Sequence, residues 1–238
     1  MSATLTVLAS GSSANGYIIQ ADNEVLILEA GVPFKECNMA LKGDISQVKA
    51  VICTHKHFDH SKYIAQYKAH GLRVYCTPEH APAADCYYMT LGLRYVFGKF
   101  KVTPVEVPHG ECQTYAYVID HPAFGRLAFI TDAEKFPYQL QGINTLMIEA
   151  NYSDDIRIDA MLNGAELRAQ SRNHMEIGET IATINRLKSP ELSSVILLHL
   201  SNGLSDAEGF KKRIFAECGV NAEVAEKNIV ISLAKADF

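Results

Sequence analysis

The chemically reactive residues of this chain are concentrated in one short stretch, HKHFDH (55–60). The chain has nine histidines in 238 residues, so three within six positions is unusual for a solvated polar loop. Imidazole and carboxylate groups without a thiolate suit zinc, manganese or iron(II). His55 and His57 can point the same way from an extended segment, whereas Asp59 and His60 point elsewhere as the chain turns. The stretch therefore predicts a loop that serves two neighbouring metal ions.

A two-metal site needs more ligands than one loop supplies, and three remote residues are candidates. His109 follows VTPVEV, Asp132 ends RLAFIT, and His199 lies in SVILLHL. Each polar group follows an apolar, strand-like run, and the loops at strand ends are where scaffolds hold chemical groups. Taken singly, His109 is also explained as a turn histidine, Asp132 as a helix N-cap and His199 as a hydrogen-bonded core histidine. Their common placement favours the metal site.

The elements that must position these residues are short strands and helices. KAVICT (49–54) is suited to a strand buried on both faces, and it leads directly into His55. Asp59 or Ser61 can cap the following helix, which ends near Gly71. The other expected strands are 4–9, 17–20, 25–30, 73–77, 115–119, 126–131, 144–150, 194–200 and 229–233. The other expected helices are 33–41, 78–86, 154–163, 175–187 and 205–218.

Both halves of the chain begin with strands and continue with strand–helix units, which predicts two sheets packed face to face with helices outside. This is an α/β (α+β) fold, a four-layer αββα sandwich, and we expect it to form a single domain over residues 1–238. The chain is 48% apolar, which is enough for a sizeable core. The six scattered cysteines contain no C-x-x-C pair, so we expect reduced thiols of a cytoplasmic protein.

Charge and hydropathy exclude several classes of protein. The net charge is −5 and no basic block is present, so an extended nucleic acid is a less expected partner than a small molecule. No apolar run approaches the ~18 residues of a membrane span, and we expect no membrane association. The N-terminus lacks the positive region of a secretion signal.

The order of the candidate ligands resembles that of the metallo-β-lactamase superfamily, over nearly the whole chain. The resemblance implies an αββα sandwich with two divalent metal ions, of which zinc is expected and manganese or iron are alternatives. It implies that a water acidified by the ions is the nucleophile. By the same resemblance, one ion is held by His55, His57 and His109, the other by Asp59, His60 and His199, and Asp132 bridges them.

Finer motifs resemble the WalJ/YycJ-like and ribonuclease Z-like phosphodiesterases of this superfamily. These motifs are SGSSAN (10–15), IEANY (148–152), NHM (173–175) and HLS (199–201). The resemblance implies that His174 binds the phosphate or acts as a general acid, with Glu149 as its partner, and it places Asp59 with them in catalysis. An ordinary residue near a helix start and a surface acid are the competing interpretations of His174 and Glu149. Glu29 stands where the family has a shorter aspartate that supports the ligands.

The overall layout, with EAGVPFKE and IEANYS, resembles small WalJ-like proteins that include the anti-Pycsar enzymes. That resemblance implies hydrolysis of 3′,5′-cyclic nucleotides such as cyclic CMP and cyclic UMP, and a homodimer. The segment 86–101 lies where the fold often carries a lid, and its rings would stack a base or pack a lid or dimer interface. Its candidate residues are Tyr87, Tyr88, Arg94, Tyr95, Phe97, Lys99 and Phe100.

Other functions use the same residues. A WalJ-like DNA exonuclease or another nucleic-acid phosphodiesterase is the nearest alternative, and a basic groove would favour it. A lactonase or thioester hydrolase would use the same metals without needing His174 and Glu149. A protein that sequesters a nucleotide without cleaving it is the alternative of another class. His70, His80 and His121 are expected to be structural or exposed.

Overall fold

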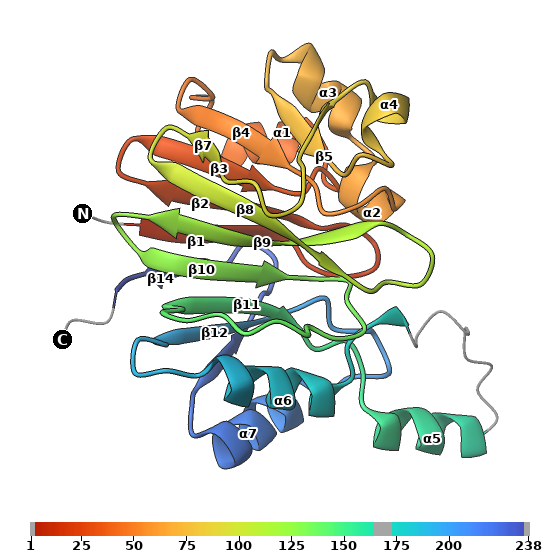
Figure 1. Ribbon diagram of the computed structural model, residues 1–238. Coiled ribbons are helices and arrows are strands. Elements are labelled where there is room, and N and C mark those ends of the chain that lie inside the picture. Colours follow the sequence, from red (N-terminus) through yellow and green to blue (C-terminus); the bar gives the residue numbers. More distant parts are fainter. Residues whose placement is uncertain (1–2, 164–172, 236–238) are drawn as a thin grey trace.

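Two seven-stranded sheets pack face to face in the computed structural model, which describes residues 3–163 and 173–235 (Figure 1). The first sheet has the order β14 (Val230–Leu233), β1 (Ala3–Ala9), β2 (Gly16–Ala21), β3 (Glu24–Leu28), β4 (Val48–Ile52), β5 (Val74–Cys76) and β6 (Tyr87–Tyr88). The second has the order β13 (Ala222–Val224), β12 (Ser194–Leu198), β11 (Thr145–Glu149), β10 (Gly125–Ile130), β9 (Thr114–His121), β8 (Phe100–Val107) and β7 (Tyr95–Phe97).

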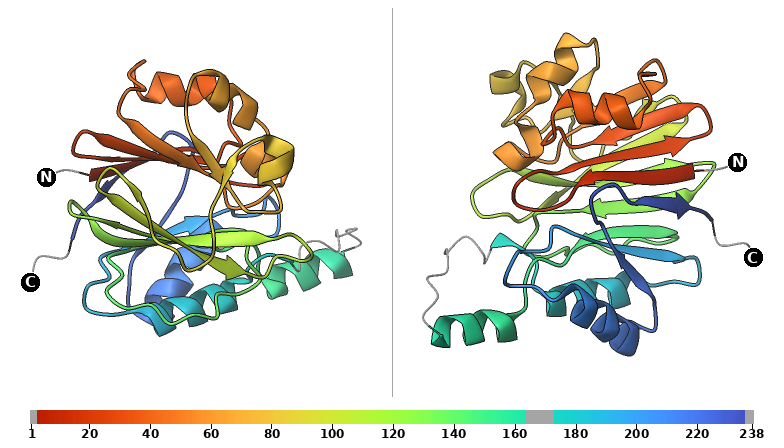
Figure 2. Two further views of the ribbon diagram at one scale, coloured as in Figure 1. Left: turned by 45° about the horizontal axis from the view of Figure 1, so that its top comes forward. Right: turned by 180° about the vertical axis from the view of Figure 1, so that it is seen from behind.

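Helices cover the outer face of each sheet, so the molecule has four layers (Figure 2). The helices beside the first sheet are α1 (Phe34–Ala40), α2 (Phe58–Ser61), α3 (Ile64–Ala69) and α4 (Ala81–Ala84). Those beside the second are α5 (Asp154–Leu162), α6 (Ile177–Leu187) and α7 (Ala207–Cys218). The predicted four-layer αββα fold is confirmed, and the single-domain organisation stays a prediction.

Three apolar clusters hold these layers together. The largest lies between the two sheets, and the other two lie between each sheet and its helices. Tyr17 of β2 and Phe129 of β10 meet edge to face across the sheets, with ring centroids 5.5 Å apart. Full burial of one large apolar side chain stabilises a fold by about 1.5–3 kcal/mol. The sandwich is therefore a rigid support for the loops at its ends.

Parallel pairing brings the ends of distant strands to one edge. In the first sheet, β3 and β4 pair in parallel and Leu28 lies opposite Ile52. In the second sheet, β10, β11 and β12 are parallel, with Ile148 of β11 opposite Ile130 of β10. The loops after these strands therefore open at the same end of the sandwich, beside α2, whereas β1 begins and β14 ends at the opposite end (Figure 1).

The helix that follows the histidine-rich loop differs from the expectation. It begins at Phe58 with His57 at the N-cap position, and it breaks at Lys62 and Tyr63 into α2 and α3. No side chain caps α2, so the predicted capping by Asp59 or Ser61 is wrong. The Asp59 carboxylate instead faces neighbouring histidines, and the Ser61 hydroxyl donates to the carbonyls of residues 56 and 57.

Two further differences concern the start of α6 and the structure of the segment 86–101. The helix expected from residue 175 begins at Ile177, because the Glu176 side chain accepts a hydrogen bond from the Gly178 backbone and caps it. The segment 86–101 forms β6 and β7, the edge strands of the two sheets.

Among the described residues, no helix is long and apolar enough to cross a membrane.

Gly31 packs so closely against the histidine-rich loop 55–60 that any larger residue would displace this loop. A Cβ at Gly31 would lie 1.6 Å from the Asp59 carbonyl oxygen, whose own partner is the Asn15 amide at 2.7 Å. We expect Gly31→Ala to lower the free energy of unfolding by about 1–3 kcal/mol, the usual cost of overpacking, and to reduce bound metal. Thermal unfolding and elemental analysis measure both effects.

The control for this prediction is Gly71→Ala. A Cβ there would meet nothing within 4 Å, although Gly71 has a φ of +80° and the variant pays for that conformation. Gly71→Ala should lose some stability and keep its metal content. Equal metal loss in both variants would contradict the role of the close approach at Gly31.

Candidate metal centre

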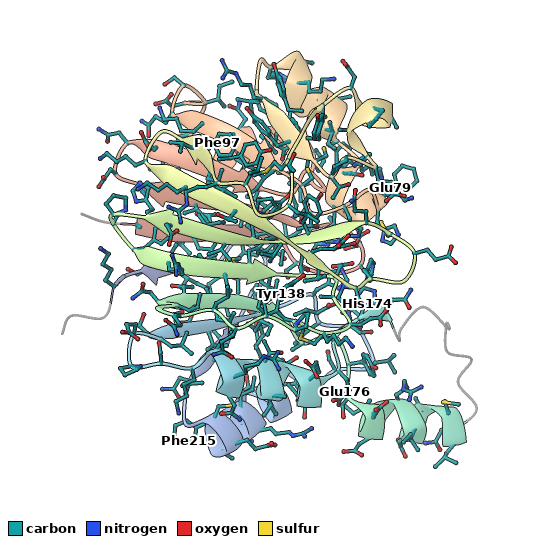
Figure 3. All side chains as sticks on the ribbon, viewed as in Figure 1. Glu79, Phe97, Tyr138, His174, Glu176 and Phe215 are labelled. Atoms are coloured by element: carbon teal, nitrogen blue, oxygen red, sulfur yellow. The ribbon has the colours of Figure 1, made fainter. Side chains whose placement is uncertain are left out.

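The seven predicted ligands converge at one end of the sandwich. The loop 55–60 follows β4 of the first sheet, while His109, Asp132 and His199 follow β8, β10 and β12 of the second. Within each of two groups, one ligand atom from every residue lies within 4.8 Å of all the others. Figure 3 places His174 at this same end, between the two sheets' loops. The structure thus brings together side chains that are up to 144 positions apart, from His55 to His199.

The first group consists of three histidines and one carboxylate oxygen. His57 Nδ1 lies 2.9 Å from His55 Nε2 and 3.2 Å from His109 Nε2. Asp132 Oδ2 lies 3.7 Å from His55 Nε2 and 3.6 Å from His109 Nε2. Four potential ligand atoms therefore surround one point, as tetrahedral coordination requires.

The second group shares Asp132 with the first. His60 Nε2 lies 3.1 Å from both Asp59 Oδ2 and Asp132 Oδ1. His199 Nε2 lies 3.3 Å from Asp59 Oδ2 and 3.6 Å from Asp132 Oδ1. Each oxygen of Asp132 thus faces one group, so this carboxylate is placed to bridge two ions.

The hydrogen bonds of the rings fit a cation in the first group. His109 Nδ1 lies 2.8 Å from the carbonyl oxygen of Asn173, which can only accept, so Nδ1 carries the proton. The lone pair of His109 Nε2 then faces His57 and Asp132. This is the arrangement by which proteins orient a metal-binding histidine. The residues present fit divalent metal ions, and the two groups are those that would hold them under the resemblance.

The charges of the centre point to the same conclusion. Burial lowers the pKa of the His60 and His199 rings, but several carboxylates acting together outweigh burial and raise both. They are Asp132, Glu29 and Asp59 at His60, and Asp132, Asp59 and Glu149 at His199. The pKa of His199 reaches about 10. The pKa of Asp132 is in turn held well below its usual range, because His199 and His60 overcome the effect of burial. The second group therefore favours positive charge, whereas burial and neighbouring histidines lower the pKa of His55 and His57 in the first group.

Three residues around the centre have backbone conformations that are unusual outside glycine. Glu29, Asp132 and His199 have φ angles of +67°, +46° and +52°. Glu29 directly follows β3 and His199 directly follows β12, while Asp132 lies just beyond the end of β10. Such conformations cost about 1–3 kcal/mol each and persist only where the surrounding structure enforces them. The strain re-aims side chains that a regular strand would direct elsewhere.

Glu29 contacts one ligand of the second group directly and one ligand of the first group through Thr54. Its carboxylate is fully buried and accepts hydrogen bonds from the Thr54 hydroxyl at 2.6 Å and the Thr54 amide at 3.2 Å. The Thr54 hydroxyl also lies 2.9 Å from His55 Nδ1, and Glu29 Oε1 lies 3.3 Å from His60 Nδ1. The additional methylene of Glu29, compared with aspartate, therefore does not prevent contact with the ligands.

Sequence reasoning assigned no role to three further polar residues that hold the ligands. The Asn15 amide donates to Asp59 Oδ2 at 3.2 Å, and the Ser10 hydroxyl accepts from the His199 amide at 2.9 Å. The Asn151 amide donates to the His199 carbonyl at 2.7 Å. These residues belong to the motifs SGSSAN and IEANY, so their signal was present without an indication of what they contact.

His174 and Glu149 form a pair beside the bridging carboxylate. His174 Nδ1 lies 2.6 Å from Glu149 Oε1, and the other Glu149 oxygen accepts from the Ala133 amide at 2.8 Å. His174 Nδ1 is 3.9 Å from Asp132 Oδ2. Burial lowers the pKa of His174, but the charge and hydrogen bond of Glu149 outweigh it and raise that pKa. The pair is therefore suited to hold a proton at the centre.

A pocket of about 700 Å³ opens over this centre. Its described lining residues are Ser12, Lys56, His57, Phe58, Asp59, Glu79, His109, Glu111, Cys112, Asp132, Asn173, His174 and His199. None of the rings of segment 86–101 is among them. Phe97 and Phe100 belong to the core between the sheets, and Tyr87 and Tyr88 are exposed on β6. The prediction of a lid is wrong for the two phenylalanines, because burying them stabilises the sandwich.

The remaining predicted residues lie away from the pocket. Lys99 pairs with Asp22 at 2.7 Å, and Arg94 does not line the pocket. His70 stacks on Phe34 with ring centroids 3.8 Å apart, as a structural histidine does. His80 and His121 likewise lie outside the three groups of possible metal ligands found among the described residues.

The comparison with protein families identifies the chain. A family model described as beta-lactamase superfamily domain matches residues 30–200, which include all seven predicted ligands. The chain belongs to the metallo-β-lactamase superfamily. Membership accounts for the two facing sheets, and it agrees with the histidine–aspartate groups at their common end.

The chain resembles several known proteins in sequence or in fold, and three of them are described here by name. An exodeoxyribonuclease YycJ of Bacillus anthracis is 27% identical over 165 residues, and the match spans 62% of each chain. The metallo-beta-lactamase fold protein YhfI of Bacillus subtilis has a TM-score of 0.75 at 16% identity, covering 98% of this chain and 100% of that one. A diphosphatase from the PhnP family has a TM-score of 0.71 at 17% identity, covering 98% and 99%. At these identities the two structures show the fold.

The family, the fold and the converging donors together describe a metal-dependent hydrolase. Divalent metal ions are the expected cofactor of this donor set, because imidazole and carboxylate bind zinc, manganese and iron(II) alike.

Asp132 provides the sharpest test of the two groups. We expect Asp132→Ala to reduce bound metal from two ions per chain to one or none, because both groups lose an oxygen that faces them. Turnover of any hydrolysed substrate should disappear. Mass-spectrometric elemental analysis after dialysis against zinc or manganese measures the metal.

Asp155→Ala on α5 is the matched control, since this aspartate is exposed and lies outside the metal-ligand groups. It should retain wild-type metal content. An Asp132→Ala protein that keeps both ions and full turnover would refute the ligand assignment.

Proposed function

We propose that the protein is a metal-dependent phosphodiesterase that hydrolyses 3′,5′-cyclic nucleotides, such as cyclic CMP and cyclic UMP, to linear monophosphates. Such an activity would counteract cyclic nucleotide immune signalling. The observation that carries the proposal is the His174–Glu149 pair beside Asp132. A carbonyl substrate has no need for a second cationic group at this place, whereas a phosphodiester carries a charged, non-bridging oxygen and a basic leaving oxygen.

In this proposal the two groups hold the cofactor and His174 serves the substrate. Divalent ions held there would supply an acidified water, with its pKa near neutrality, and would neutralise charge on a phosphoryl oxygen. The Glu149 carboxylate accepts a hydrogen bond from His174 Nδ1 and so fixes the orientation of the ring. The protonated ring binds a phosphoryl oxygen or donates a proton to the leaving oxygen. Asp59 holds His60 and His199 in place while facing the pocket.

The dimensions and charges of the pocket support a small substrate. A volume of about 700 Å³ lies within the range of ~300–1,000 Å³ that is usual for small-molecule sites. Glu79 and Glu111 at its rim repel the neighbouring phosphates of a polynucleotide. The net charge of −5 acts in the same direction.

A DNA exonuclease is the second candidate, favoured by the likeness to YycJ of Bacillus anthracis at 27% identity over 62% of this chain. The same centre and the same His174–Glu149 pair would cleave the terminal phosphodiester of a strand. The two candidates differ only in what surrounds the scissile phosphate.

We further propose that the protein forms a homodimer through the edge strands β6 and β7. Tyr87, Tyr88, Leu93 and Val96 in this segment are all more than half exposed. Exposed apolar side chains on unpaired strand edges favour association with another chain.

A turnover screen separates the candidates. The purified protein, loaded with zinc or manganese, is incubated with 3′,5′-cyclic CMP, UMP, AMP and GMP, a cyclic dinucleotide, and single- and double-stranded DNA. We expect linear monophosphates from the cyclic mononucleotides and intact DNA, read by chromatography. Stepwise digestion of DNA with intact cyclic nucleotides would instead establish the exonuclease.

The pH dependence tests the role of Glu149. Because Glu149 raises the pKa of His174 above the usual 6.5, the ring stays protonated to a higher pH, and activity should fall only as pH rises through that raised pKa. In Glu149→Gln the negative charge is lost, so the alkaline limb of kcat/KM should move to lower pH. Above that limb we expect a loss of ~10²–10⁴-fold, the usual contribution of a general acid.

Glu208→Gln on the exposed start of α7 is the control for this measurement, and its profile should match the wild type. An unshifted alkaline limb in Glu149→Gln would show that Glu149 does not set the protonation of His174.

A further inference from the structure

Phe58 presents an apolar ring to an otherwise polar pocket. It lies between two predicted ligands, His57 and Asp59, and it lines the same pocket as they do. Its side chain is 80% exposed. Apart from the histidines, it is the one aromatic residue among the described residues that line this pocket. A ring this close to the centre, with so little of its surface covered by the protein, is available to a ligand.

The backbone beneath this ring is held firmly. The carbonyl oxygen of residue 57 accepts hydrogen bonds from the His60 and Ser61 amides at 3.0 Å each. The Ser61 hydroxyl adds bonds of 2.9 and 3.0 Å to the carbonyls of residues 56 and 57. The Phe58 carbonyl accepts from the Lys62 amide at 3.0 Å, and that of Asp59 accepts from the Asn15 amide at 2.7 Å. A phenylalanine has only two side-chain torsions, so little conformational entropy is lost when a ligand fixes the ring.

The rim beside Phe58 is anchored and carries mixed charge. Lys56 forms an ion pair with Glu79, whose second oxygen accepts from the Gln113 amide at 2.9 Å. The Gln113 side chain accepts in return from the Glu79 amide at 3.0 Å. Together with Glu111, the rim thus offers two carboxylates and one ammonium group around the ring. Such a rim disfavours a row of phosphates and leaves room for one nucleotide unit.

We propose that Phe58 determines substrate specificity by stacking the nucleobase of a mononucleotide phosphodiester, while the phosphate lies at the centre. This inference rests on the proposed phosphodiesterase function and goes beyond it by assigning the base to a residue of this chain. A flat ring stacks on any base, so Phe58 selects substrates that carry a base over phosphodiesters that carry none. The acidic rim then selects a single nucleotide over a polynucleotide.

A fluorescence experiment tests the contact without relying on turnover. The chain contains no tryptophan, so Phe58→Trp introduces one reporter at the pocket. The metal-loaded variant is titrated with the slowly hydrolysed phosphorothioate analogue of cyclic CMP, and separately with dimethyl phosphate, which has no ring. We expect saturable quenching by the nucleotide analogue and none by dimethyl phosphate.

Phe215→Trp is the matched control. Phe215 is 58% exposed on α7, on the outer helical layer and away from the end that carries Glu79 and His174 (Figure 3). Its tryptophan should show no saturable quenching. Absence of quenching at position 58, or equal quenching at both positions, would overturn the proposal.

Kinetics separate this inference from the proposed function. A base stack contributes about 1–3 kcal/mol, which corresponds to ~5–150-fold in affinity, so Phe58→Ala should raise KM for cyclic CMP by that factor. Hydrolysis of dimethyl phosphate should be unchanged. Equal loss on both substrates would assign Phe58 a merely structural role. If the wild type cleaves neither substrate, the proposed function fails, while quenching at position 58 still decides whether a base binds there.

Discussion

The centre depends on one carboxylate shared between two groups of ligands. Asp132 directs Oδ1 towards His60 and His199 and Oδ2 towards His55 and His109. A buried carboxylate is costly unless positive charge compensates it, and here that compensation comes from both sides. Moving Asp132 by one rotamer would separate the two groups. Its unusual backbone conformation is therefore a cost that the surrounding contacts must offset.

Those contacts form a polar shell with one part on each sheet. On the first sheet, Glu29 reaches the ligands His55 and His60 directly or through Thr54. On the second, Glu149 holds His174. The shell is fully buried at both glutamates, where hydrogen bonds are stronger than in water and unpaired groups are more costly. The geometry of the centre is thus set by neighbours that need not touch a substrate.

The residues that the sequence singled out as ligands lie together in the structure, and they could be singled out because their signals are local. The loop 55–60 is recognisable from residue types alone. His109, Asp132 and His199 each come at or just after the end of an apolar, strand-like run, which places each residue at the end of a strand. Because β8, β10 and β12 run in the same direction, the ends of these strands lie at one edge of the second sheet. The break between α2 and α3 was not predictable, because it depends on how residues 30 and 60 pair through their backbones.

The sequence also could not predict which aromatic side chains are exposed. Phe97, Phe100, Tyr87 and Phe58 are similar in type, yet the first two fill the core and the last two face outward. Aromatic residues gain from burial wherever space exists, so only the three-dimensional arrangement decides which rings remain free. The segment 86–101 looked suited to a ligand because of its rings, but its strands close the edges of the sheets.

The distance along the chain between the ligands has a consequence for how the protein matures. Residues 55–60 are translated long before His199, and the centre is complete only when strands from both halves have paired. Contacts between such distant segments form late in folding, because long loops must close first. A nascent chain that has emerged only as far as β6 carries two pairs of ligands without their bridge. Firm capture of metal therefore belongs to the last stage of assembly, when the second sheet delivers Asp132 and His199.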